Sequence, residues 1–149
     1  DDPTDFFTDC FIPKEYDPSG TVEVGELRVT FAPTVHWVPC WAFRVSPLQE
    51  ISDLGYTADT GPHPPLERFF KGVEVLVAEG TDPEPHPENT QAGHLSPSEA
   101  AELASACGAR TLVLTHLWEE FGLEKLLADA QRHFEGNVVL ARPGTTVEW

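Results

Sequence analysis

Two histidines and one aspartate stand where predicted strands end, and their types suit a metal site. His116 closes the run LVLTH after a buried strand, Asp59 lies in YTADTGP past a strand end, and His36 precedes a turn. Ligands gather at the carboxyl ends of strands in α/β sheets. Imidazole and carboxylate ligands fit zinc, and two metals sharing a carboxylate activate water and clamp a phosphate oxygen. Taken singly, His116 also fits a capped surface histidine, Asp59 fits a helix N-cap, and His36 is a weak candidate.

Glu79 and His94 have the types needed for proton transfer. Glu79 closes the apolar strand VEVLVAE, and a half-buried carboxylate there needs a partner. His94 follows Gly93 directly before a predicted helix start, although it also fits an ordinary loop residue. A histidine that lies outside the metal shell and is oriented by a glutamate is suited to protonating a leaving group.

The other three histidines are assigned no chemistry. His63 and His86 lie in proline-rich loops and are expected to be solvent-exposed. His133 falls in the last turn of a predicted helix, where a cation complements the helix macrodipole.

Closely spaced strands are predicted in the first half of the chain. Residues 1–20 are acidic and proline-interrupted, which predicts an irregular lead-in with a short helix near Phe6 and Phe7. Apolar and polar residues alternate over 27–31, the period of a half-buried strand. Further strands are predicted over 21–24, 40–45 and 54–57, and their short spacing favours hairpins.

Strands alternate with helices after residue 70. The nearly continuous apolar run at 73–78 is typical of a strand buried on both faces. The run SPSE at 96–99 is a capping box with proline at the first helical position, and it predicts a helix that Gly108 ends. Further elements are predicted as a strand at 111–115, an amphipathic helix over 123–134, a strand at 138–141 and a candidate last strand at 145–149. The fold class is therefore α/β, with antiparallel strands followed by β-α-β-α-β.

The composition is that of one acidic globular domain. The 149 residues carry a net charge of −16, and 40% of them are hydrophobic. This acidity argues against a general nucleic-acid binder, but not against an enzyme acting on phosphates, since bound metals reverse the local field. No apolar run of about 18 residues is present, so no membrane partner is expected. Three cysteines without a CxxC pair are expected to be reduced, which favours the cytoplasm.

Five segments, in order, resemble the metallo-β-lactamase superfamily, and most closely its ribonuclease Z-like branch. They are FAPTVHWVPCWAFRV, ISDLGYTADTGP, VEVLVAEGT, GHLSPSEAAELA and TLVLTHL, and they span about residues 27–142. The second resembles the family's Y-(S/T)-G-D-T, and the third its L-L-(I/V)-x-E-(A/G)-T strand. The fourth resembles H-(S/T)-x-x-x-A-x-x-A, and the last L-x-L-(T/S)-H. Ala58 stands where the family usually has glycine.

The resemblance implies a role for each of the five candidate residues. His36, Asp59 and His116 correspond to metal ligands, with Asp59 bridging two zinc ions, although other divalent metals remain alternatives. Glu79 and His94 correspond to the catalytic pair that assists the leaving group.

The resemblance also implies a larger fold than this chain supplies. The complete family fold is a four-layer αββα sandwich of two similar halves, and residues 1–149 are expected to be its C-terminal half. The family signature HxHxDH, which supplies four further ligands, is absent, and the chain contains no Met. We therefore expect the N-terminal half to have been removed or to lie on another chain.

Three functional interpretations remain open. The first is a dinuclear zinc hydrolase of phosphodiesters, or of another ester or a lactam, that is active only in the complete chain. Its substrate is an RNA 3′ end or a small phosphodiester such as a cyclic nucleotide, which the acidity favours. The second is a non-catalytic half-domain that binds a partner or forms a homodimer through an exposed sheet face. The third is an acidic α/β domain whose motif matches are coincidental.

Overall fold

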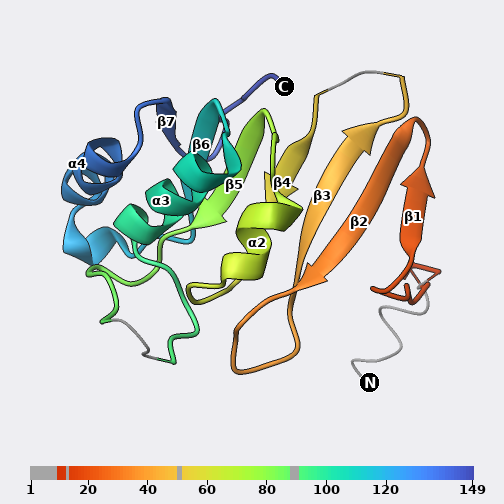
Figure 1. The fold of residues 1–149 in the computed structure, drawn as a ribbon, viewed down its shortest axis with the longest axis horizontal. Coiled ribbons are helices and arrows are strands. Elements are labelled where there is room, and N and C mark those ends of the chain that lie inside the picture. Colours follow the sequence, from red (N-terminus) through yellow and green to blue (C-terminus); the bar gives the residue numbers. More distant parts are fainter. Residues whose placement is uncertain (1–9, 13, 50–51, 88–90) are drawn as a thin grey trace.

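A computed structural model of the chain describes residues 10–12, 14–49, 52–87 and 91–149. Its strands are β1 (Thr21–Val24), β2 (Leu27–Pro33), β3 (Trp41–Pro47), β4 (Leu54–Tyr56), β5 (Val75–Glu79), β6 (Thr111–Thr115) and β7 (Asn137–Leu140). Its helices are α2 (Pro64–Phe69), α3 (Pro97–Cys107) and α4 (Leu123–His133), with a 3₁₀ turn, η1 (Glu119–Phe121). The seven strands form one sheet and lie in the order of the sequence, β1 to β7 (Figure 1).

The first four strands are antiparallel. β1 and β2 form a tight hairpin, in which Gly25 takes the left-handed backbone conformation with a φ of 59°. β2 and β3 pair over their whole length, with Phe31 opposite Phe43. The alternation over 27–31 therefore correctly predicted a strand, and pairing with β3 extends that strand to Pro33.

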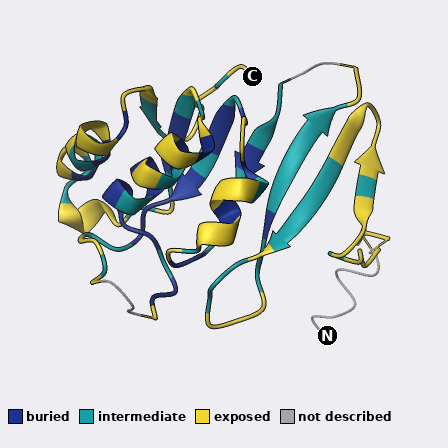
Figure 2. Cartoon of the chain, in the orientation of Figure 1, coloured by how far each residue is buried: buried dark blue, intermediate teal, exposed yellow. Residues whose placement is uncertain are grey.

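The last four strands are parallel, because α2, α3 and α4 carry the chain back across one face of the sheet. In Figure 1 these helices lie in front of the strands. Leu76, Leu112 and Leu114 point to this face and form the core with the helices, where they are fully buried. Figure 2 shows that burial is greatest over β4 to β6 and falls off toward β1. The predicted α/β class, with antiparallel strands before β-α-β-α-β, is confirmed.

Helix α3 begins and ends as the sequence predicts. The Ser96 hydroxyl accepts the Glu99 N–H, and the Glu99 carboxylate accepts the Ser96 N–H at 2.8 Å. Gly108 ends the helix with a φ of 76°. These reciprocal bonds satisfy two backbone donors that the first turn otherwise leaves without partners.

Two features differ from the prediction. Helix α2 was not predicted, because it is only six residues long and begins with two prolines; its Leu66 and the following Phe70 are buried in the core. The candidate last strand at 145–149 is wrong, because the Thr145 N–H bonds to the Arg142 carbonyl and closes a turn. The expected helix near Phe6 and Phe7 lies outside the described residues.

The face opposite the helices carries a continuous row of apolar side chains. Register places its members side by side across six strands: Phe31, Phe43, Tyr56, Val77, Val113 and Val139. All except Val113 are only partly buried. We call this set the open-face row. Among the described residues, no helix combines the length and the apolarity needed to cross a membrane.

Candidate metal centre

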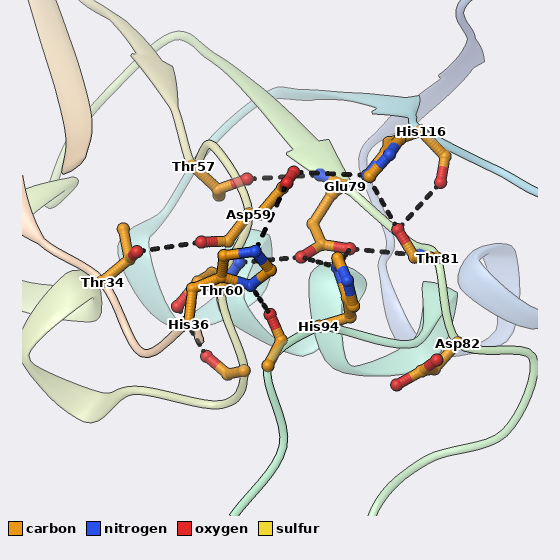
Figure 3. Close-up of polar contacts among 12 residues, drawn as sticks. Thr34, His36, Thr57, Asp59, Thr60, Glu79, Thr81, Asp82, His94 and His116 are labelled. Carbon is orange, nitrogen blue, oxygen red and sulfur yellow. Dashed lines mark hydrogen bonds and ion pairs between the residues drawn. The ribbon is translucent and has the colours of Figure 1, made fainter. Parts of the chain in front are cut away.

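The five predicted site residues meet at one edge of the sheet (Figure 3). His36 follows β2, and Asp59 lies three residues past β4. Glu79 ends β5, His94 stands just before α3, and His116 follows β6 directly. Because β4, β5 and β6 are parallel, their carboxyl ends lie at the same edge, and residues up to 80 positions apart converge there.

A backbone carbonyl fixes the tautomer of His36. Its Nδ1 lies 2.8 Å from the carbonyl oxygen of Gly93, which can only accept a hydrogen bond. Nδ1 therefore carries the proton, and the lone pair is on Nε2. That atom lies 3.8 Å from Oδ2 of Asp59.

The Glu79 carboxylate fixes the tautomer of His94 in the same way. The Nδ1 of His94 lies 3.0 and 3.1 Å from the two carboxylate oxygens of Glu79. The carboxylate also accepts the N–H groups of Thr60 at 2.8 Å and of Thr81 at 3.2 Å. Glu79 is only 2% exposed, so these bonds meet the requirement that a buried carboxylate be satisfied. Nε2 of His94 remains available for a ligand or a proton.

Thr81 orients His116. The Thr81 hydroxyl donates to the His116 carbonyl at 2.9 Å, and its oxygen lies 3.0 Å from Nδ1 of His116. Since the single hydroxyl proton is engaged by the carbonyl, Nδ1 must donate in the second contact. His116 Nδ1 also lies 3.2 Å from Oδ1 of Asp59. The acceptors at Nδ1 thus assign the Nδ1–H tautomer to each neutral ring, and Nε2 faces away from these partners.

Asp59 lies between His36 and His116. One of its carboxylate oxygens faces each histidine. The residue before it, Ala58, has a φ of 51°, and His116 has a φ of 55°. Both values fall in the left-handed region that disfavours residues other than glycine, and such strain concentrates at functional sites.

The side chains of this edge fit a bound metal. Two groups have donor atoms that all lie within 4.8 Å of one another: His36, Asp59 and His94, and Glu79, His94 and His116. Nitrogen and carboxylate oxygen donors suit zinc and similar divalent ions. A metal-bound histidine usually donates its other ring N–H to a protein acceptor, as all three do here. His94 belongs to both groups, although it was predicted to be a catalytic residue and not a metal ligand.

The negative charges of the site affect the pKa of the neighbouring Tyr56. Burial, followed by the charges of Asp59, Cys40 and Glu79, raises the pKa of its hydroxyl above the usual value of 10.0. A bound cation at this edge would offset that negative field.

Sequence reasoning missed three contributors to this edge. Thr81 and Thr60 were overlooked as partners of Glu79 and His116, because their roles appear only when separate segments meet. Trp37 packs beside both His36 and His94, at ring-centroid distances of 5.0 and 5.1 Å. A side chain at Gly93 would collide with the Trp37 ring, which explains the glycine there.

His63 and His86 are partly buried, so the prediction that both are solvent-exposed is wrong. His86 contacts Asp82 at 2.9 Å and Glu99 at 3.0 Å, which ties the proline-rich loop to α3. Burial lowers the pKa of His86, but the hydrogen bonds and charges of Glu99 and Asp82 outweigh it and raise that pKa overall. Burial lowers the pKa of His63. Neither residue joins the candidate metal centre.

A single sheet edge that gathers three oriented histidines and a carboxylate between two of them is compatible with a metallo-hydrolase. The family model of the beta-lactamase superfamily domain matches residues 12–117. The chain therefore belongs to the beta-lactamase superfamily, as the five segments predicted.

The relatives include proteins named as a probable metallo-hydrolase and as ribonuclease Z. The chain is 32% identical to "Probable metallo-hydrolase YhfI" of Bacillus subtilis over 130 residues, which is 87% of this chain and 52% of that protein. It is 38% identical to "Ribonuclease Z" of Myxococcus xanthus over 98 residues, covering 64% and 32% of the two chains. The chain thus spans about half the length of YhfI and a third of that ribonuclease Z.

Solved structures confirm the metallo-beta-lactamase fold. The crystal structure of YhfI from Bacillus subtilis matches with a TM-score of 0.78 at 30% identity, over 87% of this chain and 53% of that one. The short form of human tRNase Z matches with a TM-score of 0.56 at 20% identity, over 81% and 42%. Membership in a family of metallo-hydrolases implies a metal cofactor, and the donor set described above agrees with one.

Proposed function

We propose that this chain is the C-terminal half of a zinc-dependent phosphodiesterase, in which His36, Asp59 and His116 hold a dinuclear zinc site. The observation that carries this proposal is the placement of Asp59, with one carboxylate oxygen toward His36 and the other toward His116. A carboxylate that lies between two candidate histidine ligands is available to serve two metals. The remaining ligands come from outside the chain, which contains no HxH sequence.

The chain's own residues contribute ligand orientation and proton handling. When bound, the metals supply Lewis acidity and an activated water. Gly93 and Thr81 hold His36 and His116 with Nε2 unprotonated. Glu79 accepts the Nδ1 proton of His94, so the doubly protonated ring would give its Nε2 proton to the leaving oxygen of the substrate and return to the neutral form. The Trp37 ring packs against both His36 and His94.

A small phosphodiester is the substrate class that the charge supports. The excess of 25 acidic over 9 basic residues disfavours a long polyanion such as tRNA. The relatives named Ribonuclease Z support phosphodiester chemistry and leave an RNA 3′ end as the competing substrate.

Zinc binding by the purified chain tests this proposal. We expect competition with a chromophoric chelator to show bound zinc, and His36→Ala or His116→Ala to weaken it at least about tenfold. His133→Ala is the matched control, because His133 lies at the end of α4 against Glu102. Unchanged binding in the first two variants would contradict the proposal.

Hydrolysis assays on the zinc-loaded complete protein, in which the remaining ligands are supplied, then identify the substrate. We expect small diesters to be cleaved in preference to a tRNA precursor, with activity lost on chelation. A clear preference for the precursor would assign an RNA 3′ end instead.

A non-catalytic half-domain is the second candidate function. The partly buried open-face row supports it, because such a surface is typical of a protein interface. This candidate predicts negligible zinc binding by the chain and association through the sheet.

A further inference from the structure

A pocket beside the candidate metal centre is lined by side chains from three different segments. His116 and Leu117 line it after β6, Leu123 at the start of α4, and Leu140 with Arg142 at the end of β7. His116 belongs both to this pocket and to the candidate metal centre. The pocket therefore adjoins the position that a phosphate at the metals would take.

Among the described residues, Arg142 is one of two arginines without a carboxylate partner, and the other, Arg68, lies on α2 outside the lining of this pocket. Arg28, Arg44, Arg110 and Arg132 are each paired with a carboxylate. Among the described residues, the Arg142 guanidinium has no hydrogen bond or ion pair, although the chain is strongly acidic. A planar guanidinium with five donors binds phosphate oxygens well.

The lining of the pocket combines an apolar surface with one cation. Leu117, Leu123 and Leu140 offer contact to an uncharged ring or sugar face. Glu119 also lines this pocket. Its negative charge repels any anionic group of a ligand that is not in contact with Arg142. The pocket thus suits a nucleoside that carries a second phosphate.

We propose that this pocket binds the nucleoside and second phosphate of a small dinucleotide, with Arg142 contacting that second phosphate. The inference rests on the proposed function, because it deepens the substrate class of that site. It excludes a cyclic mononucleotide as the preferred substrate, since its only phosphate is engaged at the metals. Arg142 acts here as a specificity residue and not as a metal ligand.

Binding of two matched probes to the metal-free chain tests the inference. We compare thymidylyl-thymidine with and without a 5′-phosphate by calorimetry in the presence of a chelator. We expect the phosphorylated probe to bind about five to ten times more tightly, given an exposed guanidinium–phosphate contact. Changes in the NMR chemical shifts of the backbone amides at 115–117 and 140–142 should show that both probes bind in this pocket.

Arg142→Gln should abolish the difference between the probes. Arg68→Gln is the matched control, because Arg68 is also exposed and lies on α2, outside the lining of this pocket. The inference is overturned by equal binding of the two probes to the unaltered chain, by a difference that survives Arg142→Gln, or by its loss in both variants. This binding test uses neither metal nor turnover. Its outcome can therefore be distinguished from a failure of zinc binding or of hydrolysis, which would count against the proposed function.

Discussion

The Nδ1 atom of His36 donates a hydrogen bond to the carbonyl oxygen of Gly93, 57 residues later in the chain. Gly93 stands directly before His94, so one hydrogen bond joins the loop after β2 to the segment that leads into α3. This bond sets the ring orientation of one candidate ligand from the backbone beside another. The geometry of the metal centre therefore depends on contacts that no single segment contains.

The Thr81 hydroxyl should control metal affinity without touching the metal. Thr81→Val removes one of the two acceptors near the Nδ1 proton of His116, leaving only Asp59, and removes the donor to its carbonyl. We expect zinc affinity to fall by about 10- to 100-fold, as is typical when the outer partner of a ligand is lost. Chelator competition measures the change. Thr81→Ser keeps the hydroxyl and should bind zinc nearly as well as the original chain; an equal loss in both variants would contradict the role.

Ala58→Gly should stabilise the protein. The φ of 51° at Ala58 costs a residue with a Cβ about 1–2 kcal/mol, and the extra chain entropy of glycine offsets about 0.5–1 kcal/mol of that gain. We expect the free energy of unfolding to rise by roughly 0.5–1 kcal/mol in urea titrations. The same change at exposed Ala106 in α3 should lower it by up to about 1 kcal/mol. A decrease at both positions would refute the strain at Ala58.

The buried Glu79 should be sensitive to neutralisation. Glu79→Gln puts an amide where two backbone N–H groups and the Nδ1 proton of His94 all need acceptors. We expect a loss of about 1–3 kcal/mol in the free energy of unfolding, because a donor is left without a partner. Glu74→Gln is the control, since the Glu74–Arg110 pair lies largely at the surface. That change should stay within about 0.5 kcal/mol, and equal losses in both variants would argue against a special role for Glu79.

Protonation of His86 should stabilise the fold at acidic pH. Its pKa is raised in the folded state by Glu99 and Asp82. The folded protein therefore binds this proton more tightly than the unfolded chain does. The contribution of this proton to the free energy of unfolding is complete below the pKa of histidine in the unfolded chain, about 6.5. It is lost as the pH rises through the pKa of His86 in the folded protein. Unfolding free energies of the original chain and of His86→Gln, measured across this range, should converge at alkaline pH. Parallel curves would show that His86 does not carry the effect.

The open-face row should drive self-association. Its side chains are apolar and only partly covered, a surface that favours contact with another sheet. We expect sedimentation coefficients to increase with protein concentration. Val139→Thr adds a hydroxyl within the row and keeps a β-branched side chain, so it should reduce association with little loss of folding. A compact monomer at all concentrations would contradict this prediction.

Elements set by local chemistry could be predicted from the sequence, whereas contacts between distant segments could not. The Ser96–Glu99 capping box and the apolar run ending at Glu79 carry their structural information within a few residues, and both elements are present. The burial of His86 depends on Glu99, 13 residues away, so its proline-rich surroundings pointed to an exposed loop. The convergence of His36, Asp59 and His116 was predicted from a family resemblance. Their shared Nδ1 protonation needed the acceptors that the fold brings to each ring.

The order of the strands has a consequence for how the protein folds. Each strand pairs with the one before it, so no strand must wait for a distant segment of the chain to complete its pairing. The antiparallel pairings of β1 to β4 are close in sequence and form quickly, whereas each parallel pairing from β4 to β7 must wait for its crossover helix. Asp59 and Glu79 are placed when β4 and β5 have docked, but His116 follows β6. The metal centre is therefore assembled late, after the sheet that supports it.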